Sequence, residues 1–232
     1  MTNAHDAMPL SNSVLNNSEI IIENEFAALG LHPSIVKALD DLNYKKPTPV
    51  QAQAIPAFLA GRDLLVSSQT GSGKTAAFML PALQLISQKP RPEVVKPQRG
   101  VKGRRPRPAP ACPHLIVLTP TRELAQQVTS ATTQFDKYLR RTICASIVGG
   151  MPYPRQLEML AKMPDILVAT PGRLLDHMNS GRIDLSQLSM LVFDEADRML
   201  DMGFSEDIDA IVGQTPETRQ TLMFSATLDG RT

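Results

Sequence analysis

Short apolar runs alternate along this chain with segments whose apolar residues recur at helical spacing. The runs cover residues 63–68, 114–119, 143–148, 165–170, 190–194 and 221–225. They are nearly continuous, which is typical of strands in a sheet that is covered on both faces. The amphipathic segments cover residues 34–42, 50–60, 74–86, 122–139, 154–161 and 206–212. This alternation predicts an α/β fold with a mostly parallel, doubly wound sheet, helices on both faces and right-handed crossovers.

The composition is that of one ordinary α/β domain. The 232 residues are 42% hydrophobic and only 4% aromatic, without tryptophan, which predicts a core of aliphatic side chains. No apolar run approaches the length of a membrane span, and residues 1–17 lack the basic start and apolar middle of a secretory signal. Cys112 and Cys144 are too few for a disulfide framework, so we expect reduced thiols. These features favour a cytoplasmic monomer without a membrane partner.

The charge of the chain is unevenly distributed. Residues 88–111 hold eight Lys or Arg and one Glu, a net charge of +7, so the other residues sum to −6 within a total of +1. Six prolines in this segment disfavour a helix or a central strand, and we expect a mobile basic arm inserted between two packed elements. It is either a solvated linker or a tether that binds nucleic-acid phosphates. Residues 1–23 are expected to form a disordered tail.

A glycine-rich segment with the sequence GSGKT follows the first predicted strand at residues 71–75. Glycines let several backbone N–H groups approach the phosphates of a nucleotide, and the helix that begins near Lys74 directs its positive end toward them. Lys74 then reaches the outer phosphates, and the Thr75 hydroxyl is a ligand for Mg²⁺. The common phosphate-loop pattern has its first glycine where this chain has Ser68, so the match to it is incomplete.

Two acidic residues end the predicted strand at 190–194. Asp194 is placed to bind Mg²⁺ through water, and Glu195 is placed to orient or deprotonate an attacking water. Such a pair alone is more often a helix cap, but a phosphate loop earlier in the same sheet favours nucleoside-triphosphate hydrolysis. We therefore take Lys74, Asp194 and Glu195 as candidate catalytic residues, with Thr75 and Asp194 as candidate metal ligands.

The order of these motifs closely resembles the DEAD-box RNA helicases, whose name is spelled by Asp194-Glu195-Ala196-Asp197. The resemblance spans residues 26–227 and implies a RecA-like P-loop NTPase domain that uses ATP and Mg²⁺. Residues 24–52 look like the adenine-recognition segment of the family. There Gln51 would select adenine by a paired donor and acceptor, and Tyr44 would stack on the base. The nucleotide-binding residues implied by the resemblance are Phe26, Tyr44, Lys46, Gln51, Ser68, Gln69, Thr70, Gly71, Ser72, Gly73, Lys74 and Thr75.

Three further segments look like those that grip the RNA backbone in the family. They are Pro120, Thr121 and Arg122; Gly149 and Gly150; and Thr170, Pro171, Gly172 and Arg173. Each follows a predicted strand, where N–H groups and an Arg are available for phosphates and 2′-hydroxyls rather than for base edges. Ser225 and Thr227 resemble the segment that couples the ATP state to strand separation, with Asp197 as their hydrogen-bond partner.

Members of the family carry a second RecA-like domain, which supplies arginines to the γ-phosphate and the other half of the RNA grip. Because this chain ends at Thr232, we expect residues 53–232 to form the first helicase domain and the second domain to be absent. Closure of both domains on ATP would bend one RNA strand and separate a short duplex. The sequence of residues 193–204 looks most like that of bacterial members of the RhlE type. Two alternatives stay open: a DNA helicase, and a non-enzymatic RNA clamp gated by ATP.

The resemblance predicts that the 232-residue chain binds ATP but hydrolyses it slowly, because an arginine supplied by a second domain contributes orders of magnitude to phosphoryl transfer. Steady-state turnover with and without single-stranded RNA measures this. Appreciable RNA-stimulated turnover, or unwinding of a short duplex, would contradict the expectation.

Overall fold

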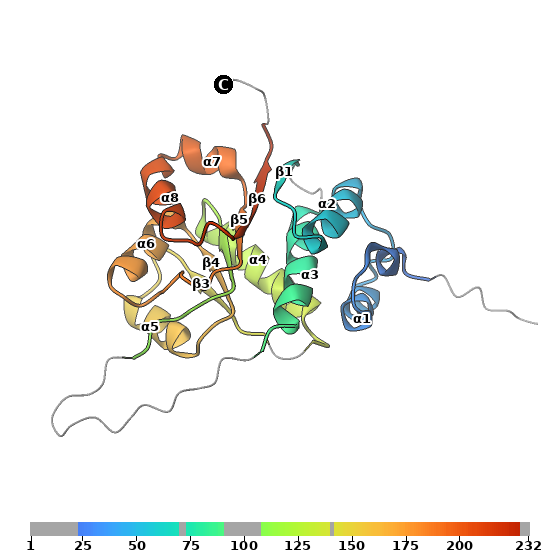
Figure 1. The fold of residues 1–232 in the computed structure, drawn as a ribbon, viewed down its shortest axis with the longest axis horizontal. Coiled ribbons are helices and arrows are strands. Elements are labelled where there is room, and N and C mark those ends of the chain that lie inside the picture. The colour runs from blue at the N-terminus through green and yellow to red at the C-terminus, as the bar shows by residue number, and fades with distance from the viewer. Residues whose placement is uncertain (1–22, 70–72, 91–107, 140–141, 228–232) are drawn as a thin grey trace, which may run out of the picture.

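A six-stranded, fully parallel sheet forms the centre of the molecule, with helices on both faces (Figure 1). The computed structural model describes residues 23–69, 73–90, 108–139 and 142–227. The predicted tail and most of the predicted basic arm therefore lie outside the described residues. The strands are β1 (Leu64–Ser67), β2 (Leu115–Leu118), β3 (Cys144–Ile147), β4 (Ile166–Ala169), β5 (Met190–Phe193) and β6 (Gln220–Ser225). The predicted α/β class and all six predicted strands are confirmed.

Some helical segments precede β1, and the others connect successive strands of the sheet. They are η1 (Glu25–Leu29), α1 (Pro33–Asp41), α2 (Pro49–Leu59), α3 (Lys74–Ser87), α4 (Arg122–Phe135), α5 (Tyr153–Ala161), α6 (Pro171–Asn179), α7 (Ala196–Asp201) and α8 (Ser205–Val212). In the part of the chain that the structure describes, no helix is both long and apolar enough to cross a lipid bilayer.

Each face of the sheet carries its own hydrophobic core. In β2, Leu115 and Val117 pack in the core formed with η1 and α1–α4, whereas Ile116 and Leu118 pack in the core formed with α5–α8. Both sets are buried, which explains why β2 is apolar at every position. Full burial of one such side chain is worth about 1.5–3 kcal/mol, so the two cores fix where each strand lies.

The strand order is β1-β6-β5-β2-β4-β3, and the strands end at one common edge. Leu118 pairs with both Ala169 and Phe193, and Ile147 also pairs with Ala169. The ladder continues one residue further at several strands. The Asp194 N–H, for example, donates to the Leu118 carbonyl at 2.8 Å. The residues that follow the strands are therefore held along the edge where ligands bind in sheets of this kind.

Three differences from the predicted elements have local causes. The helix predicted over 122–139 ends at Phe135, because Asp136 is a poor helix former and caps the helix through its N–H to the Thr132 carbonyl at 3.0 Å. The sequence analysis also missed α6 and α7, and α7 has only six residues, too few to show a helical period. For α6 a signal was present, because Pro171 occupies the first turn after Thr170 at the N-cap.

Asp136 provides a test of this packing, because burial raises the pKa of its carboxyl group to about 6. The folded pKa lies above the unfolded value of 3.8, so the charged carboxylate destabilises the fold above pH 6, and this penalty disappears as the pH falls toward 4. Asp136→Asn should therefore raise the free energy of unfolding by about 1–2 kcal/mol at pH 7.5. Thermal melts of both proteins from pH 4 to 8 measure it.

Asp209→Asn is the matched control, because Asp209 is exposed on α8. As a substitution on the surface, it should change the free energy of unfolding by less than about 0.5 kcal/mol at pH 7.5. A gain at Asp136→Asn that is equal at every pH would contradict the assignment.

Candidate functional site

Lys74, Asp194 and Glu195 lie together at the carboxyl edge of the sheet. The Lys74 Nζ is 3.0 Å from Asp194 Oδ1 and 3.1 Å from Glu195 Oε1. The three side chains are only 13%, 2% and 15% exposed, in that order. The first residue of α3 and the two residues after β5 thus form one charged cluster, although 120 residues separate them in the sequence.

Asp194 is a buried carboxylate with a free ligand position. Burial raises the pKa of Asp194, and the nearby Lys74 ammonium offsets part of that rise. Within the described residues its Oδ1 accepts no hydrogen bond of good geometry, even though it forms an ion pair with Lys74. A buried carboxylate beside a displaceable ammonium group suits a hard cation such as Mg²⁺, which is usually held by one or two carboxylates plus phosphates.

The backbone of Glu195 adopts the left-handed conformation, with φ 58° and ψ 56°. This region is uncommon for a residue other than glycine, and such strained residues cluster at active sites. The side chain is held on both sides, because Oε1 accepts from Lys74 Nζ and Oε2 lies 3.3 Å from Arg198 Nη1. The turn between β5 and α7 therefore aims Glu195 into the cluster.

The phosphate-loop segment is described only in part. Thr70, Gly71 and Ser72 lie outside the described residues. Gly73 precedes α3 with φ +77°, so Lys74 and Thr75 are the first two residues of that helix. On the other side of the loop, the hydroxyl of Ser68 is buried and has no hydrogen-bond partner among the described residues, whereas Gln69 is exposed.

Gln51 connects the predicted adenine segment to the phosphate loop. Its Oε1 accepts from the Thr48 N–H at 3.0 Å and closes a capping box at the start of α2. Its Nε2 donates to the Gly73 carbonyl at 3.1 Å. The side chain is buried, so reading adenine with both groups would require it to exchange at least one of these bonds. The Thr48-Pro49-Val50-Gln51 pattern carries the capping signal in the sequence.

The other predicted adenine residues differ in exposure. Tyr44 is 47% exposed and its ring is open to a base, whereas Phe26 is 1% exposed and lies in the core. Phe26 can thus support the segment but cannot stack on a base, and Lys46 is exposed. The sequence did not indicate Asn24, whose Nδ2 donates to the Tyr44 carbonyl at 2.8 Å and so fixes the loop that carries Tyr44.

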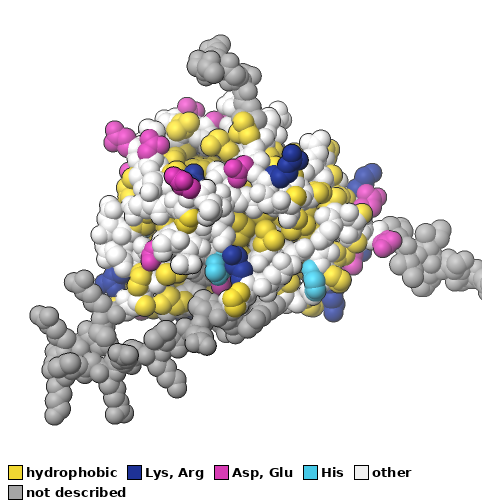
Figure 2. Space-filling model, viewed as in Figure 1, with side chains coloured by type: hydrophobic (Ala, Val, Ile, Leu, Met, Phe, Trp, Pro, Cys, Tyr) yellow, Lys and Arg dark blue, Asp and Glu magenta, His cyan; other side chains and the backbone are white. Residues whose placement is uncertain are grey.

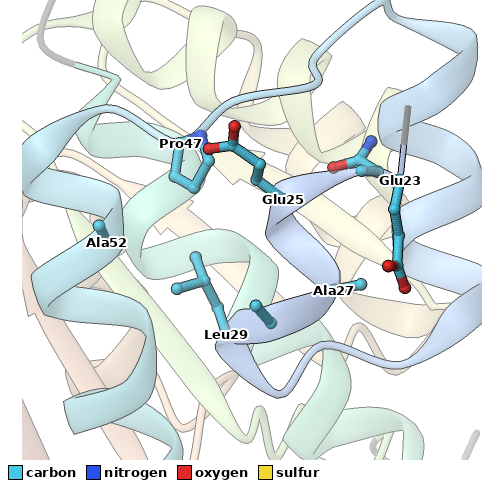
Figure 3. Close-up of a pocket in the computed structure, with 8 residues that line it drawn as sticks. Glu23, Glu25, Ala27, Leu29, Pro47 and Ala52 are labelled. Atoms are coloured by element: carbon cyan, nitrogen blue, oxygen red, sulfur yellow. The ribbon is translucent and has the colours of Figure 1, made fainter. Parts of the chain in front are cut away.

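A shallow cavity of about 590 Å³ lies beside this segment, between η1 and α2 (Figure 3). It is lined by Glu23, Asn24, Glu25, Ala27, Ala28, Leu29, Pro47 and Ala52. Neither Tyr44 nor Gln51 lines it, and two carboxylate side chains stand among its lining residues. Because carboxylates repel phosphates, this cavity is not a site for the triphosphate.

β6 lies between β1 and β5, so the residues after it stand between the phosphate loop and the acidic pair. The Thr227 Oγ1 donates to Asp197 Oδ2 at 3.0 Å. Burial acts to raise the pKa of Asp197, but hydrogen bonds from Thr227, Ser225 and backbone N–H groups outweigh it and hold the pKa below its usual value. The predicted partnership between Asp197 and the Ser225–Thr227 segment is therefore present in the structure.

The predicted RNA-binding segments occupy the other half of the edge, after β2, β4 and β3. Thr121 caps α4, so Arg122 begins the helix and is exposed. The Arg122 Nη1 lies over Gly150, where an added Cβ would stand 3.7 Å from it. The Gly149 N–H donates to the Thr170 Oγ1 at 3.3 Å. The three segments thus meet at one surface.

Arg173 is placed differently from the expectation that it reaches outward to phosphates. Its Nη1 donates to the Met151 carbonyl at 3.1 Å and to Gln156 Oε1 at 3.2 Å. Pro171 is buried in the same turn. The sequence pattern missed Gln156 and its partner His177, because single polar residues on helical faces carry no motif.

Comparison with known proteins agrees with this geometry. Residues 48–232 match the family described as DEAD/DEAH box helicase, and the chain belongs to that family. It is 50% identical over 206 residues to the ATP-dependent RNA helicase DeaD of Escherichia coli K12, covering 89% of this chain and 30% of DeaD. It is 44% identical over 205 residues to the ATP-dependent RNA helicase SrmB of the same strain, covering 88% of this chain and 42% of SrmB.

Two solved structures share the fold. A DEAD box protein from Methanococcus jannaschii superposes with a TM-score of 0.74 at 34% identity, over 88% of this chain and 50% of that one. A hypothetical ATP-dependent RNA helicase from Sulfolobus tokodaii gives 0.71 at 38% identity, over 86% and 52%. The chain therefore spans about half of these structures and a smaller share of the two bacterial relatives, and its fold is the expected RecA-like helicase domain.

Gly73 allows a direct test of the contact between Gln51 and the phosphate loop. A Cβ at Gly73 would stand 2.3 Å from Gln51 Nε2. The backbone there also has a positive φ, which residues other than glycine rarely adopt. Gly73→Ala should weaken ATP binding at least about tenfold and reduce the preference for ATP over GTP, as measured by titration with fluorescent nucleotides.

Gly61→Ala is the matched control, because Gly61 has φ +79° but no heavy atom within 4 Å of its added Cβ. It should lower the melting temperature through the same backbone strain, about 1–2 kcal/mol, and leave nucleotide affinity unchanged. Equal nucleotide affinities for both variants would show that the contact with Gln51 is unimportant.

Proposed function

We propose that this chain is the first RecA-like domain of an ATP-dependent RNA helicase, in which ATP hydrolysis drives local remodelling of RNA. The observation that carries the proposal is the placement of two sites along one edge of the sheet. The Lys74–Asp194–Glu195 cluster follows β1 and β5, and the surface of Arg122, Gly149–Gly150 and Thr170 follows β2, β3 and β4. The printed names of the relatives and their family support the same activity.

In the nucleotide half, the chain binds ATP through residues from three segments. Tyr44 stacks on the adenine, and Gln51 exchanges its contact with Gly73 for the base. Lys74 binds the outer phosphates, which compete with both carboxylates for its ammonium group. Mg²⁺ would be held by Asp194 and the Thr75 hydroxyl and would neutralise phosphate charge when bound.

Glu195 then acts on the attacking water. Once Lys74 turns to the phosphates, the exposed Arg198 is the ion-pair partner that the described residues leave to the Glu195 carboxylate, and its oxygens can orient the water or accept its proton. The left-handed backbone fixes the direction in which the side chain points. The hydrogen bond between Asp197 and Thr227 couples the acidic pair to the segment after β6, so a change at the nucleotide can shift that segment.

In the RNA half, the chain binds backbone rather than base edges. Arg122 and the N–H groups near Gly150 face phosphates, so binding is independent of sequence and weakens with salt. Exposed acids lie at the end of α7 (Asp201) and on α8 (Glu206 and Asp209), which disfavours a path for RNA across those helices. Acidic side chains are visible on the face of the molecule in Figure 2.

The full activity would also require a second RecA-like domain, as the resemblance to the family implies, and the relatives extend beyond the region that this chain matches. That domain would supply arginines to the γ-phosphate and close on the RNA. The subtype within the bacterial RNA helicases stays a prediction. The sequence of residues 193–204 favours the RhlE type, whereas relatives named DeaD and SrmB share up to half of the aligned residues. We place the protein in the cytoplasm.

Glu195→Gln tests the proposed hydrolysis. The amide keeps the size of the side chain but cannot accept a proton, so ATP turnover should fall at least about 100-fold while ATP affinity stays within threefold. Glu206→Gln on α8, where the glutamate is exposed, should change neither quantity. Retained turnover in Glu195→Gln would contradict the assigned role.

Run on the full-length protein that also carries the second domain, the same assay separates the alternatives when RNA and DNA single strands of equal length are added. The proposal expects binding and stimulation by RNA. Stimulation by DNA alone would identify a DNA helicase, and tight ATP-dependent RNA binding without any turnover would identify a clamp.

A further inference from the structure

The buried side-chain amide of Gln156 connects two of the RNA-facing segments by hydrogen bonds. Gln156 lies on α5 and is fully buried. Its Nε2 donates to the Val148 carbonyl at 2.7 Å, at the end of the strand that leads into Gly149. Its Oε1 accepts from Arg173 Nη1 at 3.2 Å and contacts His177 Nε2 at 2.8 Å, both on α6. One amide therefore ties the β3–α5 loop to the first turns of α6.

The contacts fix the direction of every hydrogen bond in this group. A carbonyl can only accept and a guanidinium can only donate, so the amide must present Nε2 to Val148 and Oε1 to Arg173. His177 must then donate from Nε2, which defines its neutral tautomer. This agrees with its Nδ1, which is buried and has no hydrogen-bond partner among the described residues. Burial, and then the charge of Arg173, lower the pKa of His177 and favour the same neutral ring.

Three further contacts hold the loop between β3 and α5 against α6. Arg173 also donates to the Met151 carbonyl at 3.1 Å, so the same guanidinium holds the far end of the loop that contains Gly150. The Tyr153 ring stacks on His177 with centroids 4.5 Å apart and planes at 12°. The loop of residues 149–152 is thereby fixed to α6 at both ends, with Gly149 N–H bonded to Thr170 Oγ1 in front.

We infer that Gln156 is a positioning residue for RNA binding: it sets the distance between the Gly149–Gly150 turn and the amino terminus of α6, so that their N–H groups meet successive phosphates of one strand. The inference rests on the proposed function and adds that Arg173 acts inward, through Gln156 and Met151. A purely structural Gln156 would contribute stability without changing RNA affinity. The two roles therefore predict different results.

Gln156→Met tests the inference, because it keeps the side-chain length and removes every hydrogen bond of the amide. In the 232-residue chain, the affinity for a single-stranded RNA oligonucleotide should fall about tenfold or more, while the affinity for fluorescent ADP stays within twofold. Gln156→Glu keeps an acceptor for Arg173 and His177 but loses the donor to Val148. Its loss of RNA affinity should be smaller, and it also serves if the Met variant does not fold.

His177 offers a matched pair of substitutions. Gln places an amide nitrogen near the position of Nε2 and Asn places one near Nδ1, so His177→Gln should retain RNA affinity and His177→Asn should lose it. Long-range ¹H–¹⁵N spectra of the wild-type chain should show a His177 ring protonated at Nε2 alone. In Gln156→Met this tautomer preference should be lost.

The outcomes separate two kinds of failure. If neither the wild-type chain nor the full-length protein with its second domain binds RNA, the proposed function is wrong and the inference falls with it. If the wild-type chain binds RNA and folded Gln156→Met and His177→Asn bind it equally well, the positioning role is wrong and the proposed function stands. A wild-type His177 protonated at Nδ1 would also overturn the inference.

Discussion

The in-register pairing of the parallel strands is the constraint on which the site depends. Leu118 pairs with Phe193 on one side and Ala169 on the other, and Ile147 pairs with Ala169, so these strands end level with one another. In a parallel sheet the carboxyl ends share one edge, and short turns leave from it into helices. The groups assigned to phosphates and to RNA lie in the segments that directly follow these strand ends, whereas the adenine segment at residues 24–52 precedes β1. Without this register, Lys74 and Asp194 could not meet.

The strand order then divides this edge into two halves. β1, β6 and β5 carry the phosphate loop, the Ser225–Thr227 segment and the acidic pair, whereas β2, β4 and β3 carry the three RNA-facing segments. The border falls between β5 and β2, which are direct neighbours. Asp194 shows how closely the halves adjoin, because its backbone N–H bonds to Leu118 while its carboxyl group contacts Lys74. One strand order therefore accounts for both the separation and the proximity of the two sites.

Much of the fold and of the charged cluster could be predicted from the sequence. Aliphatic runs mark strands buried on both faces, and GSGKT and Asp194-Glu195 follow two of those runs, so their meeting follows from parallel topology. The contact of Gln51 with Gly73 and the contacts of Arg173 and Gln156 could not be predicted, because each is decided by which backbone carbonyl lies opposite after packing. The left-handed backbone of Glu195 is likewise imposed by the turn into α7 rather than by a local preference of glutamate.

The hydrogen-bonded row just beyond the strand ends has a mechanical consequence. Asp194 N–H bonds to the Leu118 carbonyl, Thr119 N–H to the Ala169 carbonyl, and Thr170 N–H to the Ile147 carbonyl, at 2.8–3.1 Å. Strands locked in this way cannot slide past one another without breaking several bonds together, so the sheet is a stiff frame. Conformational coupling between bound nucleotide and RNA must then occur in the turns and side chains beyond the strand ends. The alternative is movement of a neighbouring domain as a rigid body.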